Sequence, residues 1–230
     1  MSSVNVSNES ALSCCESNAI HRRLSEGDDP RVLGEIYDVE TNIAVWKRTL
    51  SEELECAVDL FMDANATTKK VLAVTPDNTH EELVNAFGEA RVNKVFSEDV
   101  AQLVDMFCCL FDLKRAGLRL TVMDSAICPK FHVDKIPCRM VSTYQGIATE
   151  WLPNHLIDRS KLGLGSFGVK DEVSGLMRSL NDIQRLNCGD VALLKGEYWQ
   201  GNEGAGLVHR SPPISSGVNR LLLTLDFIDF

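Results

Sequence analysis

The sequence lacks long runs of positive charge. Its longest basic stretches are HRR at 21–23 and KK at 69–70, and the 230 residues carry a formal net charge of −10. A protein whose main partner is a nucleic-acid backbone needs clustered Lys and Arg that displace counterions from the phosphates. The composition therefore argues against nucleic acid as the main partner.

Long apolar runs are also absent. No stretch reaches the roughly 18–20 apolar residues that a membrane helix needs, and residues 1–20 lack the basic start and apolar centre of a signal peptide. We therefore expect a cytoplasmic protein without a membrane partner. Residues 1–29 are rich in Ser, Asn and acidic groups, and we expect them to form a flexible N-terminal segment.

The eight cysteines contain no Cys-x-x-Cys pair. Cys14 and Cys15 are adjacent, as are Cys108 and Cys109, which is not the spaced pattern of a disulfide framework. A chain of this length with 44% hydrophobic residues can bury a core without cross-links. We expect free thiols in a reducing compartment.

Two patterns divide the single α+β domain that we expect over residues 30–230. Helical periodicity dominates residues 30–117. Residues 118–230 consist of short apolar or β-branched runs separated by turn residues, interrupted by a helical insertion at about 155–187. The pattern predicts a β-barrel core supported by N-terminal helices.

The stretch CPKFHVD at 128–134 places His132 and Asp134 two residues apart. In a strand, side chains at i and i+2 lie on the same face, so both could bind one metal ion. Among the five histidines, His209 in GLVH lies in a β-like segment of the same half. Two histidines and one carboxylate form the facial triad of non-haem iron(II) enzymes. The alternative is that both histidines are core residues and Asp134 caps a turn.

A later strand supplies a candidate anion ligand. In NRLLLTLDF, the side chains of Arg220, Leu222 and Thr224 share one face. An arginine on the inner face of a barrel must find an anion, and its planar guanidinium suits a carboxylate held by two parallel hydrogen bonds. We therefore predict that Arg220 binds a carboxylate.

The order His-x-Asp, His after about 75 residues and Arg about ten residues later resembles that of double-stranded β-helix oxygenases that use iron(II) and 2-oxoglutarate. This resemblance implies a distorted double-stranded β-helix, a cupin-like jelly roll. It further implies that His132, Asp134 and His209 bind iron(II), and that Arg220 binds the distal carboxylate of 2-oxoglutarate.

A second resemblance rests on longer segments. CPKFHVDKIPCRMVSTYQGIATEWLP, GDVALLKGEYW, GLVHRSPP and RLLLTLDF are similar to the bacterial proteins catalogued as domain-of-unknown-function family 1826. The resemblance runs from about residue 30 to the end. It implies a fold and a set of characteristic residues, but no substrate.

Several neighbours of the triad are candidates for the same pocket. Arg139 and Tyr144 are candidate cofactor-binding residues, although their odd spacing on one strand puts them on opposite faces, so only one of them is expected to line the site. Arg210 and Ser211 follow His209 directly and are candidate contacts to the ligands or the substrate.

Zinc is the alternative metal. Cys128 and Cys138 flank the motif as Cys-x3-His-x-Asp-x3-Cys, so Cys128, His132, Cys138 and a fourth group could form a closed structural site. The sequence thus predicts an iron(II), 2-oxoglutarate-dependent oxygenase acting on an unknown small molecule or protein. A non-catalytic zinc-binding or zinc-sensing module on the same fold remains the alternative.

Overall fold

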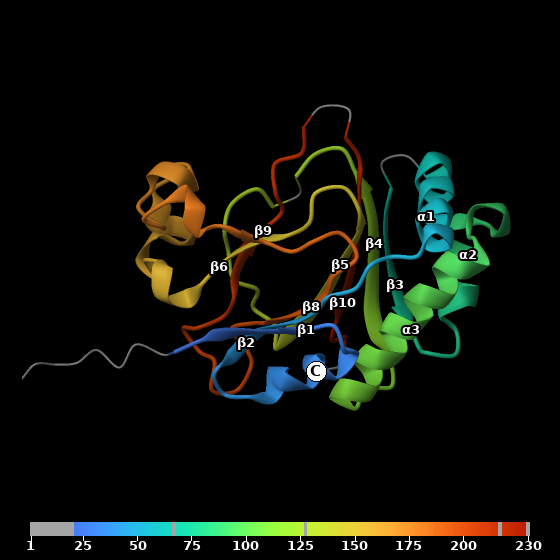
Figure 1. Ribbon diagram of the computed structural model, residues 1–230, viewed down its shortest axis with the longest axis horizontal. Helices are drawn as coiled ribbons and strands as arrows, with labels where there is room; N and C mark the ends of the chain where they lie inside the picture. Colours follow the sequence, from blue (N-terminus) through green and yellow to red (C-terminus); the bar gives the residue numbers. More distant parts are fainter. Residues whose placement is uncertain (1–20, 66–67, 127, 216–217, 229–230) are drawn as a thin grey trace, which may run out of the picture.

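The computed structural model describes residues 21–65, 68–126, 128–215 and 218–228. Figure 1 shows three layers: helices, a large sheet whose strands run through the centre, and a small sheet on the side away from the helices. The expected mixed α+β class is confirmed.

The large sheet has seven strands and the small sheet three. The spatial orders are β1-β2-β8-β5-β10-β4-β3 and β7-β6-β9, and every neighbouring pair is antiparallel except the parallel pair β1 and β2. The strands are β1 (Arg23–Gly27), β2 (Thr41–Trp46), β3 (Lys69–Val74), β4 (Ala116–Met123), β5 (Cys138–Gln145), β6 (Glu150–Leu152), β7 (Gln184–Arg185), β8 (Val191–Lys195), β9 (Val208–Arg210) and β10 (Arg220–Asp226).

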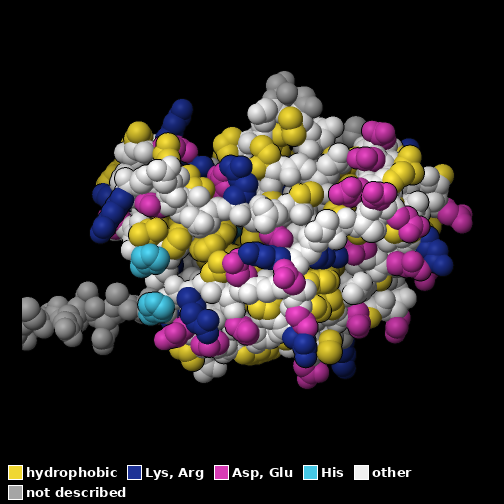
Figure 2. Space-filling view, in the orientation of Figure 1, with side chains coloured by type: hydrophobic (Ala, Val, Ile, Leu, Met, Phe, Trp, Pro, Cys, Tyr) yellow, Lys and Arg dark blue, Asp and Glu magenta, His cyan; other side chains and the backbone are white. Residues whose placement is uncertain are grey.

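Three α-helices, α1 (Glu52–Ala64), α2 (Thr79–Phe87) and α3 (Lys94–Phe111), cover one face of the large sheet. Helix α1 begins at Ser51, whose side chain accepts a hydrogen bond from the backbone N–H of Leu54. Acidic side chains gather on the surface over this helical side (Figure 2). In the described part of the chain, no helix combines the length and apolarity needed to cross a bilayer.

Side-chain alternation separates the two faces of the large sheet. On β10, Leu221, Leu223 and Leu225 enter the core beneath the helices. The opposite face packs against the small sheet through a second apolar cluster that includes Val141 and Trp151. The polar residues of β10 therefore face the space between the two sheets.

The N-terminal part of the chain is less helical than expected. Residues 1–20 of the expected flexible segment lie outside the described residues, but Arg23–Gly27 form strand β1, which backbone pairing with β2 stabilises. The expected helical support at 30–117 also supplies β2 and the start of β4, and β3 overlaps the strand that the apolar run VLAVTP at 71–76 predicts. Strand β2 is buried on both faces, so its continuous apolar run carries no two-residue period.

The insertion at 155–187 contains no α-helix, although the structure describes all of its residues. Glycines with positive φ at 163, 168 and 175 interrupt it, because this backbone conformation cannot continue a helix. The short 3-10 helices of the described residues are η1 (Pro30–Tyr37), η2 (Glu89–Arg91), η3 (Asn154–Leu156), η4 (Arg159–Lys161), η5 (Gly163–Ser166), η6 (Asp171–Val173) and η7 (Leu180–Asp182).

Candidate metal centre

The fold brings His132, Asp134 and His209 together. Each offers one ligand atom, and these atoms all lie within 4.8 Å of one another. Nε2 of His209 lies 3.4 Å from a carboxylate oxygen of Asp134, and Nε2 of His132 lies 3.8 Å from the other. His209 belongs to β9, whereas His132 and Asp134 lie between β4 and β5 in a loop rather than in the expected strand.

Backbone hydrogen bonds fix these three residues. His132 and His209 form an isolated antiparallel bridge in which each N–H donates to the other's carbonyl oxygen at 3.0 Å. The carbonyl oxygen of Asp134 accepts a 2.9 Å bond from the N–H of Glu197, just after β8. Backbone pairing between distant segments therefore brings the two histidines together, and the segment after β8 fixes the position of Asp134.

Both imidazole rings are oriented for metal binding. Nδ1 of His132 lies 2.9 Å from the carbonyl oxygen of Lys130, and Nδ1 of His209 lies 3.1 Å from that of Leu207. A carbonyl oxygen only accepts, so Nδ1 carries a proton in each ring, and Nε2 is the ring nitrogen that a metal would take from the neutral imidazole. Burial and the neighbouring His209 lower the pKa of His132, which favours its neutral, metal-binding form.

Arg139 holds the carboxylate of Asp134. Its Nη1 donates to Asp134 at 2.7 Å, while Nε and Nη2 donate to the two oxygens of Asp226 at 2.6 and 3.0 Å. Burial would raise the pKa of Asp134, but His209, Arg139 and His132 together keep it well below its usual range. Arg139 lines a pocket that His132 and His209 also line, yet its guanidinium is already paired and not free for a cofactor.

The donor set fits a divalent metal with open coordination positions: two imidazole nitrogens and one ionised carboxylate converge on one side. Cys128 lines the same pocket but is not among the converging ligands. Cys138 is fully buried in the core beneath the helices, on the other face of β5 from Arg139. The alternative closed zinc site of Cys128, His132, Cys138 and a fourth group is therefore not assembled.

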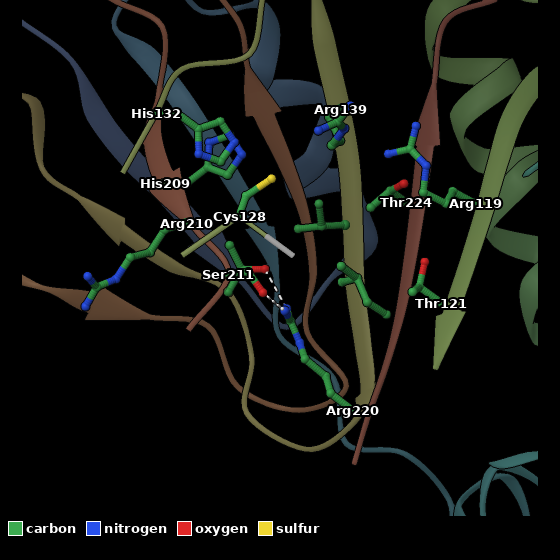
Figure 3. Close-up of a pocket in the computed structure, with 13 residues that line it drawn as sticks. Arg119, Thr121, Cys128, His132, Arg139, His209, Arg210, Ser211, Arg220 and Thr224 are labelled. Atoms are coloured by element: carbon green, nitrogen blue, oxygen red, sulfur yellow. Dashed lines mark hydrogen bonds between the residues drawn. The ribbon is translucent and has the colours of Figure 1, made fainter. Parts of the chain in front are cut away.

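Arg220 lies in the same pocket and is completely buried (Figure 3). It donates to the hydroxyl oxygens of Ser211 at 2.8 Å, Thr149 at 3.0 Å and Thr143 at 3.2 Å, and its Nε has no partner in the described part of the chain. Burial lowers its pKa to about 10, so it stays protonated at neutral pH. No described carboxylate forms an ion pair with it, and a buried unpaired charge is costly. This end of the pocket therefore favours an anion.

The residues after His209 have different roles. Ser211 accepts the bond from Arg220, and its N–H donates to the carbonyl oxygen of Cys128 at 3.0 Å. Arg210 donates to Glu150 and Glu172, each at 2.8 Å, and its guanidinium stacks over the ring of Phe131. Arg210 therefore lines the pocket with its charge already neutralised.

Tyr144 lies outside the pocket. Its hydroxyl donates to Asp99 at 2.6 Å, and its ring packs edge-on against Phe96 in the core beneath the helices. Burial raises the pKa of Tyr144 well above its ordinary value.

Two threonines that accept hydrogen bonds from Arg220 were not predicted from the sequence. Thr143 lies on the same face of β5 as Arg139, so strand alternation could have identified it. Thr149 lies in a loop, where no sequence pattern points to it.

Solved structures similar to this fold include two plant enzymes. One is a dioxygenase for auxin oxidation from Arabidopsis thaliana in a 2-oxoglutarate complex, with 10% identity, a TM-score of 0.48 and coverage of 91% of this chain and 93% of that one. The other is the dioxygenase for auxin oxidation in rice, with 11% identity, a TM-score of 0.47 and coverage of 90% and 83%. Both TM-scores lie below 0.5, so function is inferred below from the residues of this chain.

No curated protein matches the sequence. A family model described as protein of unknown function (DUF1826) matches residues 27–226. The matched region contains His132, Asp134, His209 and Arg220 and covers most of the chain. The expected resemblance is confirmed, and this chain belongs to the DUF1826 family.

Proposed function

We propose that this protein is a non-haem iron(II), 2-oxoglutarate-dependent oxygenase built on a distorted double-stranded β-helix. The observation that carries the proposal is the buried, carboxylate-free guanidinium of Arg220 in the pocket of the His-Asp-His group. A structural metal site has no need of such a group, whereas a dicarboxylate co-substrate does. The two facing sheets, antiparallel except for the pair β1 and β2, suit this architecture.

In this proposal, His132, Asp134 and His209 would hold iron(II). When bound, the metal supplies redox chemistry in which dioxygen is reduced, 2-oxoglutarate is decarboxylated to succinate, and one oxygen atom passes to the substrate. Arg220 would orient the distal carboxylate. The apolar side chains of Leu222 and Val141 would keep water away from the bound co-substrate.

The test is co-substrate binding to protein loaded anaerobically with iron(II). We expect a weak visible absorption band when 2-oxoglutarate chelates the metal. Arg220→Leu should weaken 2-oxoglutarate binding by about 100-fold, because it removes about 3 kcal/mol of charge-assisted hydrogen bonding. Metal content should not change. Tyr144→Phe is the matched control and should bind 2-oxoglutarate normally, because its hydroxyl lies on the other side of the large sheet.

The alternative is a non-catalytic zinc-binding or zinc-sensing module. Two histidines and one aspartate also suit zinc. Tight zinc binding with no spectroscopic or calorimetric response to 2-oxoglutarate would refute the oxygenase proposal. Loss of metal from Arg220→Leu would instead give Arg220 a structural role.

A further inference from the structure

The end of the pocket opposite Arg220 contains a second under-neutralised arginine. Arg119 on β4 lies directly across from Thr224 on β10, so both side chains occupy the pocket face of the large sheet. Figure 3 shows Arg119 and Thr224 on the side of the pocket away from His132 and His209.

Among the residues that the structure describes, two buried polar atoms at this end have no hydrogen-bond partner: Nε of Arg119 and Oγ1 of Thr224. The nearest carboxylate to the Arg119 guanidinium is Asp226, at 3.8 Å. Both oxygens of Asp226 already accept short bonds from Arg139. The Nε–H of Arg119 and the hydroxyl of Thr224 are thus left without an acceptor among the described residues, and buried polar atoms of this kind cost free energy until they are paired.

The charge of the pocket is also unbalanced. Three guanidinium groups, from Arg119, Arg139 and Arg220, face two carboxylates, from Asp134 and Asp226. The remaining arginine of the lining is paired with glutamates. The pocket is therefore a positive region within a chain whose net charge is −10. Such a region attracts anions from solution.

One small carboxylate cannot satisfy both ends. Arg220 and Thr224 are four residues apart on β10, which separates their Cα atoms by roughly 13 Å at about 3.3 Å per residue. Leu222 lies between them, and Val141 of β5 pairs with Thr224 beside it. The pocket face of the large sheet thus has a polar group at each end and apolar side chains between them, which suits two separate ligands.

The Arg119 end is open to solvent through the edge of the large sheet. The Arg119 side chain is 34% exposed. Lys69 and Val71 on the edge strand β3 pair with Thr121 and Arg119, so they lie on the same face, and both are exposed. A ligand can therefore reach Arg119 without passing Arg220.

We propose that Arg119, together with Thr224, binds the carboxylate or phosphate group of a small-molecule substrate whose body lies along Leu222 and Val141. The description of that ligand as the substrate rests on the proposed function. The anion site itself depends only on the unpaired donors and the charge of this end of the pocket. Lys69 adds positive charge at the entrance.

Isothermal titration calorimetry with two probes, benzoate and inorganic phosphate, tests the proposal. Both are titrated into the full-length protein in saturating 2-oxoglutarate, so that the Arg220 end is occupied. We expect at least one probe to bind, and Arg119→Gln to weaken it by about 10-fold or more, the loss of one charge-assisted hydrogen bond. Lys70→Gln is the charge-matched control, because Lys70 lies on the same edge strand but pairs with Leu120 on the helix-facing side. It should leave binding unchanged.

Equal binding by wild type and Arg119→Gln, equal loss in Lys70→Gln, or no binding of either probe to wild type would overturn the proposal. Arg119→Lys keeps the charge but loses Nε, so it should bind the probe with intermediate affinity. This variant provides the test if Arg119→Gln folds poorly. A preference for benzoate or for phosphate identifies the anionic group. Arg220→Leu should keep the probe site. If 2-oxoglutarate fails to bind while a probe still requires Arg119, the oxygenase proposal falls and the anion site stands.

Discussion

Replacing Arg139 with methionine should strongly destabilise the protein and its metal site. The substitution removes three hydrogen bonds of 2.6, 2.7 and 3.0 Å and leaves Asp134 and Asp226 as mostly buried carboxylates without their main partner. Breaking a buried ion pair in this way costs about 3–5 kcal/mol. For a chain of this size, such a loss lowers the melting temperature by roughly 6–20 °C.

Urea denaturation measures this loss of free energy of unfolding. The control is Arg23→Met, because Arg23 pairs with Asp38 at 2.9 Å with side chains 42% and 45% exposed. An exposed ion pair of this kind contributes at most about 1 kcal/mol. Metal competition should also show a loss of about 10- to 100-fold in affinity for Arg139→Met, since Arg139 orients the carboxylate of Asp134.

A double variant decides whether orphaned carboxylates cause the loss. Adding Asp226→Asn to Arg139→Met removes one of the two carboxylates that have lost Arg139, so the double variant should be more stable than Arg139→Met alone. A double variant that is equally stable or less stable would refute this explanation. So would a loss for Arg139→Met that is no larger than that of Arg23→Met.

Two further predictions concern the strand that ends beside the metal centre. Gly196→Ala would place its Cβ 2.0 Å from the carbonyl oxygen of Ile136 and 2.9 Å from that of Asp134. We therefore expect urea denaturation to show a free energy of unfolding lower by about 1–3 kcal/mol, together with weaker metal binding. Unchanged metal affinity would contradict this prediction. Burial lowers the pKa of Lys195 to about 8 from 10.5, so between these pH values the unfolded chain holds more protons and the free energy of unfolding rises with pH. Lys195→Met should lack this rise, and an identical pH profile would show that Lys195 does not cause it.

The local pattern of the sequence was sufficient for the inward face of β10. Strict alternation put Arg220, Leu222 and Thr224 on one face, and all three line the pocket. The same rule separated Arg139 from Tyr144, but it could not say which of the two faced inward. That depends on which side of the sheet the helices cover, and α3 packs on the side of Tyr144.

Local pattern was misleading where tertiary pairing decides the structure. The glycines at 163, 168 and 175 adopt positive φ and replace the expected helical insertion with 3-10 turns. Strand β1 has little apolar character and forms through backbone bonds to β2. Neither outcome follows from helical or strand periodicity in a single sequence.

The sequence by itself determined the identities of the three candidate ligands and of Arg220, because residue type limits metal and anion chemistry and the order of these residues along the chain is specific. Only the tertiary structure decided how they are used. The reciprocal backbone bonds of His132 and His209 and the bonds from Arg139 to Asp226 join segments far apart in the chain. The neutralisation of Arg139, the absence of a described carboxylate partner for Arg220 and the long 3.8 Å separation of Arg119 from Asp226 likewise follow from which side chains the fold places near one another, and a linear sequence does not contain those distances.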